Sequence, residues 1–317
     1  MEGYESTDAV ISSEELRTLN QRSNVRGALQ TGSHILAIGL VACALNRSES
    51  MAWSVALFAM LGILINFLYA GQHELSHWTV FRTRSLNTAF GHLFGFILLL
   101  PREYDRIEHF QHHRHTQDPE LDGELQGAPF FEGLGPYLWY ASGIGYWLNA
   151  ISRLLKTALA RGFPPFFTRA QRRLVTREAR CYLSLYLLIA LASWHSGSWA
   201  AITYWLAPML TMKFVHLCQN LAEHTGMPNE QSILVNTRTI HSNRVLSWLS
   251  WNMPYHMAHH SYPAVPFFRV PELHARMAEQ LADEPETIGY LSYQWQMLKK
   301  LKADGTSEYR GRALSEY

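Results

Sequence analysis

The sequence has 317 residues, enough for one large domain or two small ones, and 48% of them are hydrophobic. Its formal net charge of +1 is too small for the basic surface that nucleic-acid binding requires, so no nucleic-acid partner is expected. The cysteines Cys43, Cys181 and Cys218 are isolated and form no C-x-x-C pair, which predicts buried free thiols in a reducing compartment.

The first part of the chain predicts a polar segment followed by a membrane hairpin. Residues 1–26 lack the apolar core of a cleaved signal peptide, so we expect a cytosolic N-terminal segment and a mature chain that starts here. Residues from about 27 to 45 and from 51 to 70 are apolar for close to the roughly 20 residues that a helical span requires. A second pair of predicted spans covers about 182–194 and 198–214, and the polar links 46–50 and 195–197 are short.

Two segments between the hairpins are expected to lie in or at the membrane without crossing it. The apolar run 90–100 is too short for a span and is interpreted as a dipping helix. Residues 133–151 are rich in glycine and aromatic residues, which is typical of an interfacial or re-entrant segment. The loop that follows, up to Arg180, is strongly basic, so this loop and both termini should be cytoplasmic.

Nine of the sixteen histidines occur at spacings typical of metal ligands. One pair is spaced i, i+4, and two clusters have the pattern H-x-x-H-H, which places their imidazoles on one helix face. The nine candidates are His73, His77, His109, His112, His113, His224, His256, His259 and His260. Under the predicted topology all of them emerge on the cytoplasmic side.

The chemistry of these side chains narrows the metal. Imidazole is a common ligand of iron, zinc and copper, and the absence of clustered thiolates argues against an iron-sulfur site. Nine ligands are too many for one zinc ion and suit two iron ions. The sequence therefore predicts a site for two first-row transition metal ions.

These clusters resemble the histidine boxes of the membrane fatty acid desaturase superfamily, which includes desaturases, lipid hydroxylases and carotenoid ketolases. The resemblance covers most of the chain, from the first hairpin to about His274. The matching motifs are His73-Glu74-Leu75-Ser76-His77, His109-Phe110-Gln111-His112-His113, Asn220-Leu221-Ala222-Glu223-His224 and His256-Met257-Ala258-His259-His260.

The resemblance implies a non-heme diiron centre held by the nine histidines, with O2 as co-substrate and Asn220 as a weak or water-mediated ligand. It also implies an all-α integral membrane protein of two transmembrane hairpins, or four spans, under a cytosolic helical cap. We expect this desaturase-like domain to cover residues 27–274, and an amphipathic helix with a tail to cover 275–317. No catalytic residue is expected beyond the metal ligands.

Ligating histidines usually donate their second ring N–H to a carboxylate or carbonyl group. Polar residues close to the clusters in sequence are therefore candidates for contacts with the ligands. They are Glu74, Asp105, Glu108, His115, Asp118, Asp122, His216, Glu223 and Asn252. Arg102 and Arg106 are candidates for contact with a lipid head group or an electron donor.

Several functional alternatives remain open at this stage. Desaturation of an acyl chain in a membrane lipid is the main expectation, and hydroxylation or ketolation by the same set of ligands is the alternative. A remote alternative is an intramembrane zinc metalloprotease, because His73 to His77 also match H-E-x-x-H and Leu121-Asp122-Gly123 resembles the motif that supplies its third ligand.

The sequence contains no fused electron-transfer module, so the electrons must come from a separate donor such as a ferredoxin, a rubredoxin or cytochrome b5 with its reductase. The basic loop with Arg169, Arg172 and Arg173 is a candidate docking surface for an acidic donor. We expect the site to face the cytoplasm from a bacterial inner membrane or an endoplasmic reticulum membrane.

Overall fold

The computed structural model describes residues 10–124, 130–230, 232–281 and 287–317. Helices dominate these residues, which agrees with the predicted all-α class. The strands in the described part are β1 (Thr239–His241) and β2 (Thr287–Gly289), which pair in parallel. They join two distant parts of the chain and form no larger sheet.

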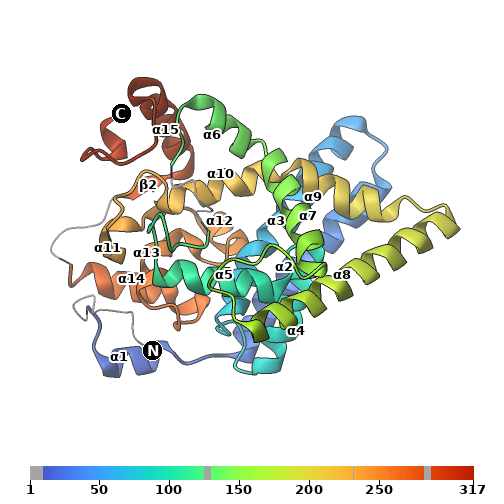
Figure 1. The fold of residues 1–317 in the computed structure, drawn as a ribbon, viewed down its shortest axis with the longest axis horizontal. Helices are drawn as coiled ribbons and strands as arrows, with labels where there is room; N and C mark the ends of the chain where they lie inside the picture. Colours follow the sequence, from blue (N-terminus) through green and yellow to red (C-terminus); the bar gives the residue numbers. More distant parts are fainter. Residues whose placement is uncertain (1–9, 125–129, 231, 282–286) are drawn as a thin grey trace.

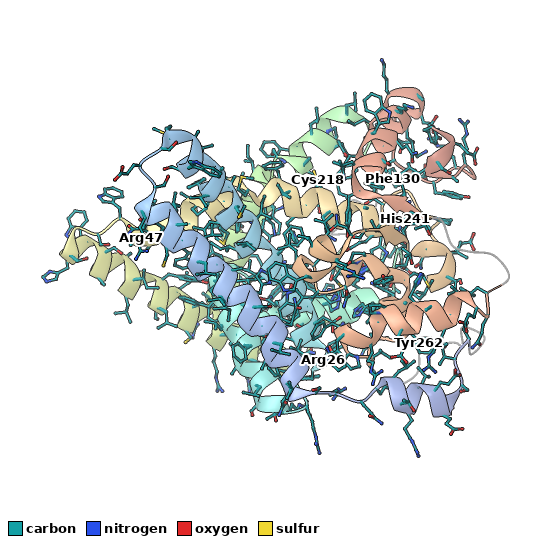
Figure 2. The ribbon with its side chains drawn as sticks, turned by 180° about the vertical axis from the view of Figure 1, so that it is seen from behind. Arg26, Arg47, Phe130, Cys218, His241 and Tyr262 are labelled. Carbon is teal, nitrogen blue, oxygen red and sulfur yellow. The ribbon has the colours of Figure 1, made fainter. Side chains whose placement is uncertain are left out.

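The first predicted hairpin is formed by α2 (Asn24–Arg47) and α3 (Met51–Ser76), both long and apolar enough to cross a membrane. Ser23 caps α2 by accepting a hydrogen bond from the backbone N–H of Arg26. α2 lies along the outside of the molecule (Figure 2), whereas α3 is buried from Leu61 to its end. α3 therefore leads from the hairpin into the interior, where its last turn carries His73.

The second predicted hairpin has other bounds than expected. α8 (Arg169–Ser196) begins well before residue 182, because Thr168 and Gln171 form a capping box there. Residues 198–214 contain the π-helical turn η1 (Ile202–Leu206) and α9 (Ala207–Thr211), and α10 (Lys213–His224) begins near their end. Among the helices of the described residues, only α2 and α3 meet the length and hydropathy of a span, so four spans are not confirmed.

The second half of α8 nevertheless exposes a continuous apolar surface. Leu187, Leu188, Leu191 and Trp194 are all more than half exposed. Apolar patches of this kind on a single helix mark surfaces that face lipid or another protein. This exposure is the feature of α8 that fits a place in a membrane.

The prediction of buried thiols is wrong for two of the three cysteines. Cys43 of α2 and Cys181 of α8 are exposed on the protein surface, because both lie on the outward faces of these helices, and Cys218 of α10 is half-buried.

The segments expected to lie at the membrane surface are short helices. α4 (Arg84–Ile97) has 14 residues and is about 21 Å long at 1.5 Å per residue, too short to cross a hydrocarbon core of about 30 Å. The left-handed Leu99 and then Pro101 separate it from α5 (Arg102–Arg114). The glycine-rich segment forms α6 (Leu134–Ala141) and α7 (Ile144–Ala158), which meet at the left-handed Gly143.

The remaining helices are all shorter than α2, α3 and α8. They are α1 (Ser13–Leu19), α11 (Ile233–Asn236), α12 (Arg244–Leu249), η2 (Met253–Tyr255), α13 (His256–Ser261), η3 (Phe267–Arg269), α14 (Val270–Ala278), α15 (Tyr290–Asp304) and η4 (Leu314–Glu316). α15 lies in the segment expected to form a C-terminal amphipathic helix: Tyr293 and Met297 are buried in a cluster with Leu221 of α10, while the apolar Leu291 and Trp295 are exposed.

The molecule is elongated, with its long hydrophobic helices gathered toward one end. In Figure 1, α8, α9 and the α2–α3 hairpin occupy the right side, and α13, α14, α11 and α15 occupy the left. α5 lies in the middle between these two parts. The histidine-bearing helices α3, α5, α10 and α13 therefore meet where the apolar half joins the helical cap.

Candidate metal centre

The nine predicted histidines converge into two buried groups. The first group takes its histidines from the end of α3, from α5 and from α13: its members are His73, His77, His109, His113 and His259. The second group consists of His112, His224, His256 and His260. Within each group, one ring nitrogen of every histidine lies within 4.8 Å of the others.

The helical spacing explains how one motif serves both groups. On α5, His109 and His113 are one turn apart and lie on the same face, so both reach the first group. His112 precedes His113 by one position, which turns its side chain by about 100° and directs it to the second group. α13 divides its histidines in the same way, with His259 in the first group and His260 in the second.

The distances between ring nitrogens fit shared metal ions. The Nε2 atoms of His73 and His259 are 2.7 Å apart, and those of His77 and His109 are 2.8 Å apart. In the second group, the Nε2 atoms of His224 and His256 are 2.9 Å apart. Two imidazoles bound side by side to one ion, each at about 2.1 Å, have nitrogens about 3 Å apart. The pairs therefore have the separation that metal ligation requires.

Burial and protonation favour a cation at these positions. Burial lowers the pKa values of His113, His256 and His260 well below the usual histidine range, so their rings are neutral and offer lone pairs. The Nε2 atom of His260 is buried and has no hydrogen-bond partner within the described residues, while its Nδ1 lies 3.3 Å from the Thr116 hydroxyl. A metal ion would satisfy this nitrogen, and imidazoles form a suitable ligand set for two such ions.

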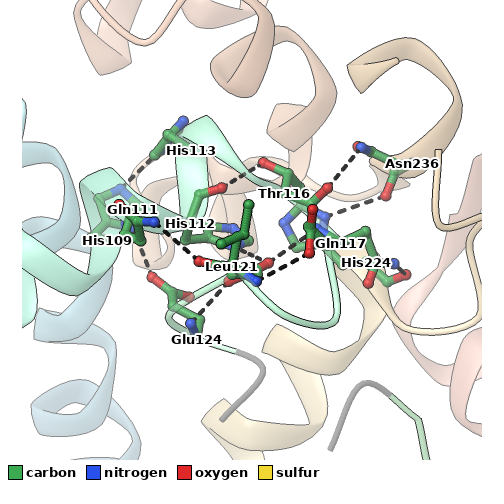
Figure 3. A network of polar contacts seen from close by, with 12 residues as sticks. His109, Gln111, His112, His113, Thr116, Gln117, Leu121, Glu124, His224 and Asn236 are labelled. Atoms are coloured by element: carbon green, nitrogen blue, oxygen red, sulfur yellow. Dashed lines mark hydrogen bonds and ion pairs between the residues drawn. The ribbon is translucent and has the colours of Figure 1, made fainter. Parts of the chain in front are cut away.

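Carboxylates contact the Nδ1 atoms of several of these imidazole rings. His112 Nδ1 donates to Asp122 at 2.8 Å, and His109 Nδ1 donates to Glu124 at 2.9 Å (Figure 3). Nδ1 of His259 lies 3.2 Å from the carboxylate of Glu74. The hydrogen bonds of His112 and His109 fix the Nδ1–H tautomer of these two rings, so that Nε2 faces the group. The glutamates Glu74 and Glu223 and the aspartate Asp122 were predicted from sequence; Glu223 lies 3.6 Å from His256 Nε2.

Glu124 was missed by the sequence analysis. It follows Asp122 by two residues in the loop after α5, and only the path of that loop brings it back to His109. Burial opposes its ionisation, but the charge of His112 and the hydrogen bond from His109 outweigh burial and lower its pKa to about 2. Glu124 is therefore an anion beside both groups. The signal in the sequence that could have identified Glu124 was its position two residues after the candidate Asp122.

Other predicted residues have different partners. Asp105 accepts a hydrogen bond from Gln72 at 2.9 Å, and Glu108 forms an ion pair with Arg153 at 2.8 Å. The side chains of three remaining candidates have other partners: Asp118 accepts backbone N–H groups in a turn, Asn252 donates to the backbone of Phe267, and His216 lies against Lys213. The side-chain partners of these candidates are therefore residues other than the nine histidines. His115 ends α5, and its backbone N–H donates to the carbonyl of His112.

Asn220 and the two arginines have distinct positions. Asn220 is half-buried, one turn before His224 on α10, and its role as a weak or water-mediated ligand stays a prediction. Arg102 is buried and paired with Glu103, which Arg106 also binds at 2.8 Å. Arg102 is thus enclosed inside the protein and does not form part of an exposed contact surface.

The arrangement also bears on the protease alternative. The two histidines of the H-E-x-x-H motif, His73 and His77, lie in one group with three further histidines. Asp122 contacts His112, which belongs to the other group. Glu74, which would be the general base of a protease, accepts a hydrogen bond from Thr79 and faces His259. This geometry leaves no three-ligand site of the protease type at His73 and His77.

Comparison with known proteins agrees with this geometry. A sphingolipid delta(4)-desaturase of Drosophila melanogaster is 24% identical over 260 residues, covering 74% of this chain and 70% of the relative. An sn-1 oleoyl-lipid 12-desaturase of Anabaena variabilis is 20% identical over 280 residues, covering 78% and 77%. A sphingolipid delta(4)-desaturase/C4-monooxygenase of Rattus norvegicus is 24% identical over 272 residues, covering 82% and 77%. Residues 50–292 match the fatty acid desaturase family, so the chain belongs to this family.

Proposed function

We propose that this protein is an O2-dependent lipid desaturase that introduces a double bond into an acyl chain of a membrane lipid, with two non-heme iron ions held by the nine histidines. The observation that carries the proposal is the convergence of all nine rings into two buried groups in a chain of the desaturase family. When bound, the iron would supply the activation of O2 and the oxidising power that removal of hydrogen from an unactivated C–H bond needs.

The protein's own residues prepare the site for this chemistry. The imidazoles of α3, α5, α10 and α13 provide the ligands, and Asp122 and Glu124 hold His112 and His109 in the ligating tautomer. Burial of the groups excludes bulk water, which protects reactive species from side reactions. No side chain is required as a nucleophile.

Hydroxylation is the second candidate function. One relative carries both a desaturase and a monooxygenase name, which indicates that this scaffold serves both reactions in that protein. The two outcomes share ligands and differ in how the target C–H bonds meet the oxidant. Ketolation belongs to the same alternative, since it also adds oxygen to the lipid.

Electrons are proposed to come from a separate ferredoxin, rubredoxin or cytochrome b5, and the site is proposed to face the cytoplasm. Arg169 and Arg173 are exposed at the start of α8 and are available to an acidic partner. Replacing Arg169, Arg172 and Arg173 by glutamine should raise the donor concentration needed for half-maximal turnover. An unchanged donor dependence would reject docking at this surface.

The central experiment combines metal analysis with lipid mass spectrometry. The purified protein should contain about two irons per chain, and expression in a host of known lipid content should yield lipids two hydrogens lighter. Lipids one oxygen heavier would indicate hydroxylation, whereas one zinc and no lipid product would reject the proposal. His109→Ala should abolish the product, and His195→Ala, which changes an exposed histidine at the end of α8, is the matched control.

A further inference from the structure

A small basic pocket opens beside the first histidine group. Its volume is about 180 Å³, and we call it the Trp78 pocket; it is lined by Arg22, His77, Trp78, Arg82 and Arg84. The volume corresponds to about six water molecules at roughly 30 Å³ each. It can hold one small polar group and is too narrow for the surface of a folded protein.

The pocket is held together by contacts between segments far apart in the sequence. Asn24, at the start of α2, donates to the hydroxyl of Thr83 at 2.9 Å and accepts from its backbone N–H at 3.0 Å. Asn87 of α4 forms hydrogen bonds with both backbone groups of Phe81. These contacts bring Arg22 beside Arg82 and Arg84, so the three arginines are placed by the fold.

The floor of the pocket is an indole with an unusual backbone. Trp78 has φ +56°, a left-handed conformation that side chains other than glycine rarely adopt. The guanidinium of Arg84 lies 4.3 Å from the centre of the Trp78 ring, and the guanidinium of Arg106 lies 5.1 Å from the centre of the same ring. The Trp78 Nε1 atom is buried and has no hydrogen-bond partner within the described residues.

No ion pair of the described residues balances the charges in the pocket. Glu103, on the neighbouring helix α5, is paired with Arg102 and Arg106. Within the described part of the chain, Arg22, Arg82 and Arg84 form no ion pair with an acidic residue. Three guanidinium groups are all hydrogen-bond donors, and together they call for an anion with several acceptor oxygens.

We propose that the Trp78 pocket binds the phosphate group of a membrane lipid. Planar guanidinium groups bind phosphate oxygens through paired hydrogen bonds, and the Trp78 ring holds the Arg84 guanidinium in place by stacking against it. The position favours a lipid over a free ion, because Arg22 lies two residues before α2, a helix long and apolar enough to span a membrane. Basic residues at such a helix end lie at the level of lipid head groups.

The pocket also touches the proposed metal centre. His77 contributes to the pocket wall and belongs to the first histidine group, and Trp78 follows it directly in the chain. A head group bound here would lie beside one metal ligand. The binding proposal itself depends only on the pocket's arginines and indole, so it can be tested on protein with or without metal.

The test measures binding of three probes to the purified full-length protein in detergent. Dioctanoyl phosphatidic acid has two short acyl chains and a phosphate, dioctanoylglycerol has the same chains without it, and inorganic phosphate is the free anion. The phosphatidic acid should bind tightly and the other two weakly. Arg82→Gln together with Arg84→Gln should weaken its binding about 25-fold, at about fivefold for each arginine near a membrane surface.

Two further variants separate the pocket from general charge effects. Arg310→Gln removes an exposed arginine near the C-terminus and should leave the affinity unchanged. Trp78→Phe leaves a smaller aromatic ring beneath the Arg84 guanidinium, and should weaken binding by a smaller factor than the double arginine variant. The thermal midpoint of each variant establishes that the protein is folded when binding is measured.

Several results would overturn the proposal. Equal affinity for phosphatidic acid and dioctanoylglycerol would mean that the phosphate is not recognised. Equal affinity for inorganic phosphate would assign the pocket to a free anion. A double arginine variant that binds phosphatidic acid normally but needs more electron donor would assign the arginines to an acidic protein. None of these results would affect the proposed lipid oxidation, which iron content and lipid products test separately.

Discussion

Replacing Asp122 by asparagine should remove one of two metal ions while leaving the protein folded. Asp122 Oδ2 accepts hydrogen bonds from His112 Nδ1 at 2.8 Å and from the backbone N–H of Gln117 at 3.0 Å. Its Oδ1 accepts from the backbone N–H of Glu124 at 2.9 Å. Asparagine has only one acceptor oxygen, so its amide N–H groups must face at least one of these donors.

The size of the effect follows from these contacts. A hydrogen bond to a charged group contributes about 1.5–3 kcal/mol, and loss of such a partner behind a metal ligand typically lowers metal affinity by about 10–100-fold. At about 1.4 kcal/mol per tenfold change, the two figures agree. Only the second group contains His112, so iron content should fall from about two toward about one per chain during titration with a chelator.

Iron content after stepwise addition of chelator is the measurement. Asp118→Asn is the matched control, because Asp118 lies in the same loop but accepts only the backbone N–H groups of Glu120 and Leu121. Its iron content should equal that of the wild type. If Asp122→Asn retained both irons at chelator concentrations that the wild type resists, the inference that Asp122 positions a metal ligand would be wrong.

Three further predictions concern the ligands, the helix packing and the pH response. His260→Ala should lose iron from the second group and all lipid product, and retained product would contradict the ligand assignment. Gly62→Ala should destabilise the protein by about 1–3 kcal/mol, because the new Cβ would lie 2.1 Å from the backbone oxygen of Pro208; Gly39→Ala, with open space around it, is the control in thermal unfolding. Burial raises the pKa of Asp105 to about 7, so the folded state binds its proton more tightly and this residue costs stability as pH rises from about 4 to 7. Asp105→Asn should therefore raise the thermal midpoint more at pH 8 than at pH 5, and an equal gain at both would refute this.

The histidine ligands were predictable because their signal is local. Spacings of three and four residues place rings on one helix face, and three such stretches are visible without any tertiary information. The first hairpin was predictable for a similar reason, since hydropathy over about 20 residues is a property of one segment. The family resemblance rests on the same short motifs and needs no knowledge of how they meet.

The helix bounds of the second apolar pair were less predictable. The capping box at Thr168 extends α8 far into the basic loop, and the π-helical turn at Ile202–Leu206 divides the next apolar stretch. Hydropathy indicates where a chain is apolar, but caps and turns decide where a helix begins and ends. The apolar pattern alone was therefore not sufficient to predict the bounds of the third and fourth spans.

The sequence by itself determined which imidazoles are available and on which helix faces they lie. Only the tertiary structure decided that they divide into groups of five and four, that Glu124 reaches His109, and that Glu108 instead pairs with Arg153. Positions within one helix follow from its 3.6-residue period, which the sequence displays directly. Contacts between loops and helices far apart in the chain depend on how the whole molecule packs, and no local pattern contains that information.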